Sequence, residues 1–181
     1  MMIDSLRKLF AYYHDLGTKA ISQTSDADLS HVLTPEGNSI SLVVKHMAGN
    51  MRSRFTDFQT SDGEKPWRDR KKEFTGAHAD RAALLADWES GWARFYAAVD
   101  PLTDADLEHI VHIRNEGHTV LEALHRQLAH YAYHVGQIVV LARSFAGDRW
   151  ISLSIPRGGS AAFNKEKFSG DKKRKHFTEG K

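Results

Sequence analysis

The sequence predicts an all-α protein, built as a four-helix bundle with an irregular C-terminal extension. Four segments repeat their apolar residues at helical spacing, and stretches rich in Pro, Gly, Asp and Asn separate them. No segment of comparable length alternates apolar and polar residues as the strands of a large sheet do. The chain has 181 residues, 41% of them hydrophobic, which is enough for one domain with a core of its own.

The first two helices are expected over residues 3–22 and from Asn38 to residues 56–58. The first has an apolar stripe that begins at Ile3 and ends at Ala20. In the second, Asn38 is the expected N-cap, and an apolar seam follows it. Both stripes have the width of a helix that packs on one side, as in a bundle.

The other two helices are expected over residues 77–99 and 119–146. The former has a wide apolar face, and the Asp-Pro pair that ends in Pro101 stops it. The latter opens with a capping box, in which Thr119 and Glu122 satisfy each other's backbone N–H groups. Its apolar seam then continues over many turns, so it is the longest helix expected.

The connections bear on the topology. The link over residues 60–76 is too polar for the core and long enough to cross the bundle, which gives an up-down-down-up order of helices. Short links elsewhere favour antiparallel neighbours, so up-down-up-down stays open. Residues 109–120 alternate around a turn at Asn115 to Gly117, which allows a short hairpin. We expect one domain over residues 1–168 and a charged flexible tail over residues 169–181.

Composition and charge exclude several classes of protein. Lys and Arg number 25 against 23 Asp and Glu, so the formal net charge of +2 gives no basic field of the kind that binds nucleic acids. Only "KKRK" at residues 172–175 is a basic cluster. Because Cys is absent, any metal site must use His, Asp or Glu. The N-terminus lacks the apolar region of an export signal, and no apolar run is long enough to span a membrane, so we expect a soluble, cytoplasmic protein.

Two histidines of the last helix lie on a polar stripe of their own. At about 100° per residue, His130 and His134 fall on one face together with Gln127 and Gln137, beside the apolar seam. The Cβ atoms of a pair at this spacing lie about 6 Å apart, so both imidazoles can bind one cation. His125 points away from this face and does not belong to the pair.

The second helix has a similar polar stripe, with His46 and Asn50 beside its apolar seam. A stripe that faced water would be expected to hold Lys and Glu rather than His, Asn, Gln and Ser. Two interpretations follow. Either His46 is the third ligand of a metal site, or these are partly buried histidines that form hydrogen bonds with neighbouring amides and carbonyls. The residues alone leave both open.

Several stretches resemble one known family. "VVKHMAGN" on the second helix, "HRQLAHYAYHVGQIV" on the fourth and "SLSIPRG" after it are similar to the DinB/YfiT-like superfamily of metalloenzymes, and more narrowly to one of its bacterial branches, over residues 3–163. The resemblance implies an up-down-down-up bundle, a homodimer, and a divalent metal site formed by His46, His130 and His134. Characterised members of the superfamily include thiol-dependent S-transferases and isomerases, so the reaction stays open.

Three imidazoles leave a coordination position open, which is typical of a catalytic metal site. A cation there lowers the pKa of bound water, which gives hydrolysis, or of a small-molecule thiol, which gives S-transfer. Since no carboxylate lies on either stripe within one turn of a histidine, we expect thiol activation rather than hydrolysis. The candidate catalytic residues, which would bind substrate, orient the imidazoles or transfer protons, are Asn50, Gln127, Gln137 and Tyr133.

The expected cofactor is one divalent metal ion, with Zn²⁺ foremost and Ni²⁺ or Fe²⁺ as further candidates. The expected cosubstrate is a low-molecular-weight thiol. We also expect Arg68, Arg70 and Arg157 to lie at the rim of the pocket and bind an acidic small-molecule substrate. The alternatives are a metal-dependent hydrolase and a non-catalytic metal-binding or ligand-binding protein. A role with nucleic acids would rest on the basic cluster alone and is not expected.

Overall fold

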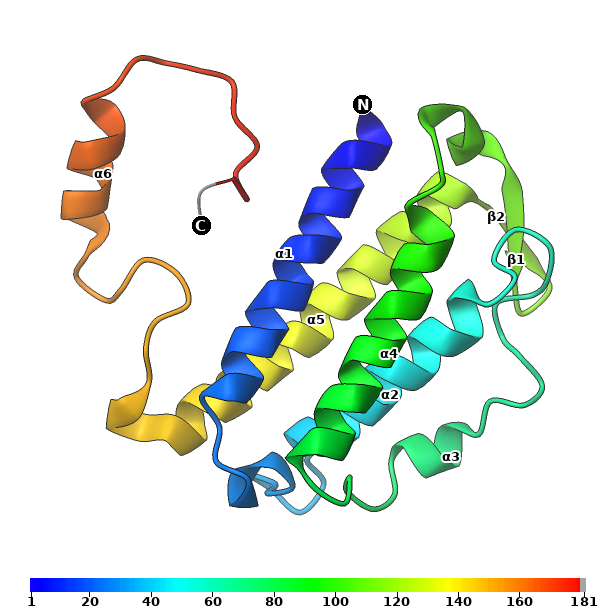
Figure 1. The fold of residues 1–181 in the computed structure, drawn as a ribbon, viewed down its shortest axis with the longest axis horizontal. Helices are drawn as coiled ribbons and strands as arrows, with labels where there is room; N and C mark the ends of the chain where they lie inside the picture. Colours follow the sequence, from blue (N-terminus) through cyan, green and yellow to red (C-terminus); the bar gives the residue numbers. More distant parts are fainter. Residues whose placement is uncertain (180–181) are drawn as a thin grey trace.

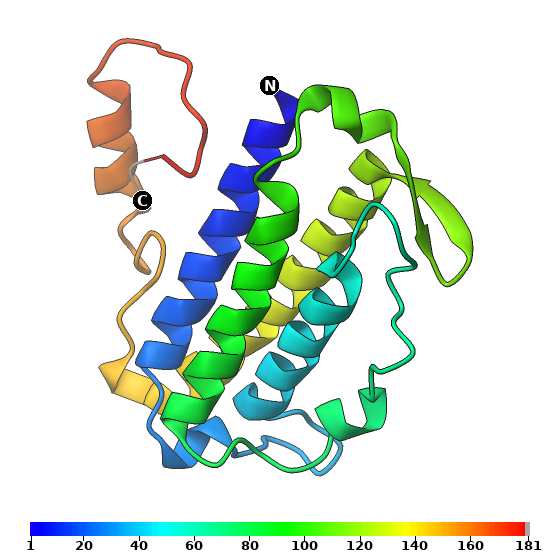
Figure 2. The ribbon, with the colours of Figure 1, turned by 45° about the vertical axis from the view of Figure 1, so that its right-hand side comes forward.

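Four long helices form the body of the protein, which a computed structural model describes over residues 1–179. They lie side by side in Figures 1 and 2 and are α1 (Met2–Ser22), α2 (Ile40–Phe55), α4 (Arg81–Val99) and α5 (Val120–Ala146). The shorter elements are α3 (Arg70–Glu73), α6 (Ser160–Phe168), the strands β1 (Ile110–Ile113) and β2 (Glu116–Thr119), and 3-10 turns at Ala27–Leu29, Asp104–Glu108 and Gly147–Arg149. The prediction of a mostly helical protein is confirmed, and the strands form one small two-stranded sheet.

Large aromatic side chains occupy the centre of the core. Trp92 is fully buried, and its ring lies edge-on to those of Trp88, Phe95 and Tyr131. Phe10 of α1 packs against Phe95 of α4 at a centroid distance of 4.3 Å. Such rings remove large areas from water and prefer tilted or edge-on contacts. They therefore hold α1, α4 and α5 together, while α2 packs against α4 and α5.

Two helix starts differ from those expected. The N-cap of α2 is Ser39, whose side chain accepts a hydrogen bond from the N–H of Leu42, and not Asn38. The helix expected from residue 77 begins at Arg81, since the carboxylate of Asp80 accepts from the N–H of Ala83. The capping box at the start of α5 is confirmed. Where two neighbouring residues can both serve as the N-cap of a helix, as Asn38 and Ser39 can, the sequence does not determine which one does.

The hairpin is present, with its turn one residue earlier than expected. Arg114 and Asn115 form the two-residue turn, with φ angles of 57° and 62°, and Ile113 pairs with Glu116. Two consecutive positive φ angles are typical of a type I′ turn, which matches the twist of the strands. The hairpin is therefore a tight, regular one that leads directly into the start of α5.

The link between α2 and α4 is attached to this hairpin. The carboxylate of Asp62 accepts hydrogen bonds from the backbone N–H groups of Arg114 and Asn115, and the N–H of Gly63 donates to the carbonyl of His112 at 2.8 Å. Burial alone would raise the pKa of Asp62, but the backbone N–H donors lower it to about 2. None of residues 60–76 belongs to the hydrophobic core, as their polarity predicts, although Glu73 is buried as a charged residue against α2.

The C-terminal extension was expected to be irregular, but it contains one short helix, α6. In Figure 1, α6 lies apart from the long helices, and none of its residues is buried. A helix that buries no face needs no apolar stripe, so its sequence carries no periodic signal. Farther on, His176 hydrogen-bonds with Ser5 at 3.2 Å, and Glu179 forms an ion pair with Lys8.

The division into a domain over residues 1–168 and a tail over residues 169–181 stays a prediction, and residues 180 and 181 of that tail lie outside the described part of the chain. Within the described residues, none of the helices is both long and apolar enough to cross a membrane.

Candidate metal centre

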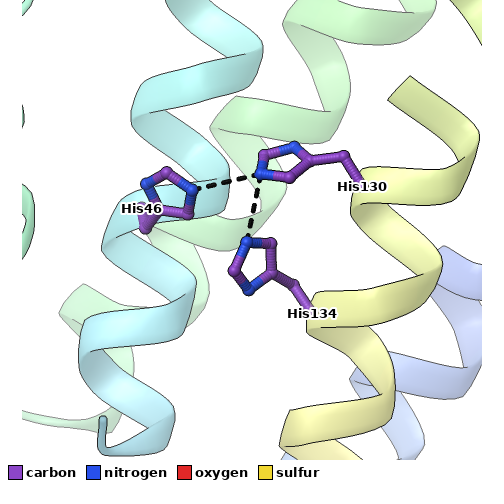
Figure 3. Close-up of side chains that lie close together, drawn as sticks. All are labelled: His46, His130 and His134. Atoms are coloured by element: carbon purple, nitrogen blue, oxygen red, sulfur yellow. Dashed lines mark hydrogen bonds between the residues drawn. The ribbon is translucent and has the colours of Figure 1, made fainter. Parts of the chain in front are cut away.

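Three histidines from two helices meet where α2 packs against α5. His46 comes from α2, and His130 and His134 come from α5, as Figure 3 shows. The Nε2 atom of His130 lies 3.2 Å from that of His46 and 3.1 Å from that of His134. The helical stripes predicted from the sequence thus face each other across the contact of α2 and α5.

The spacing of the nitrogens suits one shared cation. Two nitrogen ligands of a tetrahedral Zn²⁺, each about 2.0–2.1 Å from the ion, lie roughly 3.4 Å apart. The ligand atoms of His46, His130 and His134 all lie within 4.8 Å of one another. Among the residues described, these three form the group of His, Asp and Glu side chains able to hold a metal ion.

The orientation of His46 is set by a buried carboxylate. Its Nδ1–H donates to Oε2 of Glu73 at 2.9 Å, because an ionised carboxylate can only accept. Burial alone would raise the pKa of Glu73, but the hydrogen bonds from His46 and Arg68 lower it below its ordinary value. Arg68 holds the other side of the carboxylate, with Nε donating to Oε1 at 2.7 Å. The lone pair of His46 is therefore on Nε2, toward the other histidines.

His134 is oriented by an amide. Its Nδ1–H donates to Oε1 of Gln137 at 2.9 Å, and the amide nitrogen of Gln137 donates in turn to the hydroxyl of Tyr133. Burial lowers the pKa of His134, and burial with the neighbouring imidazoles lowers the pKa of His130 to about 3. Both imidazoles are neutral near pH 7, which is the protonation state that binds metal ions.

Glu73 is the residue of this centre that the sequence did not predict. The expectation that no carboxylate lies near a histidine holds for the two helical stripes but overlooks the loop. Glu73 reaches His46 because Gly49, which lies about one turn after His46 on α2, has no side chain. A Cβ atom at position 49 would lie 2.4 Å from Oε1 of Glu73. A glutamate in a polar link has no periodic pattern, and in "RDRKKEF" it is one of two acids among four cations.

The structure separates the predicted catalytic residues into two groups. Asn50 and Gln127 are buried and line a cavity beside His46 and His130. Gln137 contacts His134, whereas Tyr133 is 63% exposed, donates no hydrogen bond to a histidine within residues 1–179, and meets the centre through Gln137 and through an edge-on contact of its ring with His134 at a centroid distance of 5.0 Å. Of the arginines expected to receive an acidic substrate, Arg68 and Arg70 line the cavity, and Arg157 is an exposed residue outside it.

Two further histidines are partly buried for structural reasons. His14 stacks on Trp92 at a centroid distance of 4.7 Å and contacts the hydroxyl of Tyr96. His78 lies between Ser41 and Asp87, at 2.8 Å and 3.1 Å. Each of these side chains has its polar atoms satisfied by neighbours, which is the usual state of a buried histidine.

A sequence profile of one protein family matches residues 1–159. The match covers most of the chain and includes all three histidines and Glu73. The chain belongs to the family DUF1572. The description of DUF1572 reads "Protein of unknown function", and the matched segment ends directly before α6. No curated protein and no solved structure matches the chain.

Within this DUF1572 chain, neutralising Glu73 is expected to weaken metal binding. We expect Glu73→Gln to lower the affinity for Zn²⁺ about 10-fold to 100-fold, because carboxylates that hydrogen-bond a ligating imidazole raise its basicity and hold its orientation. Competition titration against a chromogenic chelator measures this.

The matched control is Glu64→Gln. Glu64 also lies near Arg68, at 3.5 Å, but does not contact a histidine. Equal affinities of Glu73→Gln and wild type, or an equal loss in Glu64→Gln, would contradict the role given to Glu73.

Proposed function

We propose that this protein is a metal-dependent enzyme of the DinB/YfiT-like superfamily, in which His46, His130 and His134 hold one divalent cation and a small-molecule thiol is activated for S-transfer. The observation that carries the proposal is the convergence of three Nε2 atoms, two of them turned inward by hydrogen bonds on their Nδ1 atoms. Zn²⁺ is the first candidate, and Ni²⁺ and Fe²⁺ suit the same ligands.

The donor set supports a cation at this place. The Nδ1–H groups of His46 and His134 donate to Glu73 and Gln137, so both side chains direct Nε2 toward His130. His130 can donate its proton to only one of them, which leaves nitrogen lone pairs that repel each other. A positive ion between the three nitrogens removes this repulsion. Three protein ligands with an open position are typical of catalytic and not of structural zinc sites.

A divalent cation held by neutral imidazoles is a Lewis acid that lowers the pKa of a thiol or a water molecule bound to it. The residues of the chain favour the thiol. Glu73 is held by His46 and Arg68 and has a lowered pKa, so it is not available as a general base for water. Asn50 and Gln127 line the cavity beside the histidines, where their amides can orient a substrate.

The order of the helices supports the resemblance. In Figures 1 and 2, α1 and α5 run in one direction and α2 and α4 in the other, as an up-down-down-up bundle requires. The homodimer belongs to the same proposal. Tyr133 and Val140, two turns apart on α5, leave apolar surface exposed on one face of that helix.

The proposed activity is tested with zinc-loaded protein, a thiol donor (cysteine, glutathione or coenzyme A) and the electrophile monochlorobimane. The thiol sulfur displaces chloride, and the fluorescent thioether is measured. We expect turnover that depends on the thiol, is lost when a chelator removes the metal, and returns when Zn²⁺, Ni²⁺ or Fe²⁺ is added.

The other outcomes decide between the alternatives. Full metal occupancy without turnover for any thiol would indicate a non-catalytic metal-binding protein. Metal-dependent cleavage of a nitrophenyl ester in the absence of thiol would indicate a hydrolase that uses water.

A further inference from the structure

A cavity of about 170 Å³ lies beside the histidines, and its lining is basic. Residues of α2, α5, the link before α4 and the hairpin contribute to it. The arginines that line it are Arg54, Arg68, Arg70, Arg114 and Arg126. No acidic side chain is among the described residues of this lining. A cluster of guanidinium groups around one small space is the arrangement with which proteins bind oxyanions.

Only two of these arginines have carboxylate partners. Arg68 is paired with Glu73, and Arg114 lies 3.3 Å from Glu64. In the part of the chain that the structure describes, no carboxylate lies within ion-pair distance of the other three, which are Arg54, Arg70 and Arg126. The cavity therefore has an excess of positive charge that the protein itself does not neutralise.

Arg54 is the buried member of this set. Its residue is 4% exposed, and its Nε and Nη1 atoms have no hydrogen-bond partner within residues 1–179. Burial, together with the nearby cations Arg126 and Arg68, lowers the pKa of Arg54 to about 10, so the group is still charged near pH 7. Buried charged groups in proteins are normally paired, and an unpaired one points to a ligand.

The amides between the arginines and the histidines are also incompletely satisfied. Gln127 is 2% exposed, and its Oε1 atom has no partner among the described residues. Asn50 accepts from the hydroxyl of Tyr131 through Oδ1, at 3.1 Å, which leaves its amide nitrogen to donate. The cavity thus offers one acceptor and one donor near its middle, in addition to the arginines.

These groups follow one another along the two helices. On α2, Asn50 is one turn and Arg54 two turns beyond His46, which is about 6 Å and 12 Å along the axis. On α5, Arg126 is one turn before His130, about 6 Å away along the axis. A molecule in the cavity would therefore meet histidines at one end and guanidinium groups at the other.

We propose that the cavity binds an oxyanion group of the substrate, a phosphate or a carboxylate, through Arg54 and Arg126. The inference rests on the proposed function, because the reacting end of the same molecule meets the histidines. The substrate class is then a small acidic molecule whose oxyanion lies roughly 6–12 Å from its reacting atom. The segment between them both donates and accepts a hydrogen bond, at Gln127 and Asn50.

The test is the binding of two simple anions to the metal-free protein by isothermal titration calorimetry, with inorganic phosphate and succinate as probes. We expect saturable binding of one of them, weakened at least about 10-fold by Arg54→Met and by Arg126→Met, since each removes charged hydrogen bonds to the anion. Arg157→Met is the matched control and is expected to bind as wild type does, because Arg157 does not line the cavity.

The relative affinities identify the anion: tighter phosphate binding indicates a phosphate group, and tighter succinate binding a carboxylate. Arg126 is an exposed residue, so its variant is informative even if Arg54→Met fails to fold. Absence of saturable binding for both probes, or equal affinities of wild type and Arg126→Met, overturns the proposal. Because neither metal nor turnover enters this measurement, anion binding by a protein without S-transfer activity would overturn the proposed function alone.

Discussion

Untagged protein purified with Zn²⁺ in the medium is expected to contain about one equivalent of zinc per chain, and His130→Ala is expected to contain none. His130 is the middle member of the cluster, in contact with both His46 and His134, so its removal takes away the shared ligand. The loss of affinity for Zn²⁺ should exceed the roughly 100-fold that is expected for Glu73, which hydrogen-bonds a ligating imidazole without touching the ion. Plasma mass spectrometry measures the content, and competition titration measures the affinity.

The matched control for His130→Ala is His125→Ala. His125 is an exposed histidine of the same helix, on another face, and is not among the histidines that meet. Its replacement should leave the zinc content unchanged. A zinc content of His130→Ala equal to that of wild type, or an equal loss in His125→Ala, would show that zinc binds elsewhere. Thermal unfolding of both variants verifies that they are folded.

The second large effect is expected in the packing of α2 against α4. Gly91 of α4 faces Ala48 of α2 so closely that a Cβ at position 91 would lie 2.8 Å from the Cα of Ala48 and 3.1 Å from its Cβ. A backbone atom cannot turn aside as a long side chain can, so Gly91→Ala must push the helices apart. We expect overpacking to cost up to about 3 kcal/mol and the better helix propensity of Ala to return about 1 kcal/mol. The free energy of unfolding should therefore fall by about 2 kcal/mol, measured by urea denaturation.

Gly136→Ala is the matched control, with the opposite expected sign. Gly136 is also in the interior of a helix, but it is exposed and a Cβ there would meet no atom within 4 Å. This substitution should raise the free energy of unfolding by about 0.5–1 kcal/mol, because it restricts the unfolded chain without strain in the folded one. If both substitutions stabilise the protein, the close approach of α2 and α4 at Gly91 is refuted.

The consequence of this close approach reaches the metal centre. Ala48 is two residues from His46 on α2, so a shift of α2 away from α4 at Ala48 would also move His46. Gly49, the next residue, admits the carboxylate of Glu73. One segment of α2 thus has small residues on two sides, one for the contact with α4 and one for the residue that orients a histidine.

The helices and the histidine pair could be predicted because they depend on neighbours in the sequence. The capping box of Thr119 and Glu122 involves residues of one turn, and His130 and His134 share a face through helix geometry alone. The same periodicity indicated that His46 and Asn50 form a polar stripe on α2. That the stripes of α2 and α5 face each other was implied by the family resemblance and not by either helix alone.

The partners of these residues were decided by the tertiary structure. Glu73 is 27 residues from His46, and it reaches His46 because Asp62 fastens the link to the hairpin and Gly49 leaves room. Arg54 and Arg126 lie on different helices and meet at one cavity only when α2 and α5 pack. Tyr133 is largely exposed, and its ring packs edge-on against His134 while its hydroxyl accepts a hydrogen bond from Gln137. Short-range hydrogen bonds and helical periodicity determined the elements and the three histidines, whereas long-range packing decided that Glu73 orients His46 and which arginines surround the neighbouring cavity.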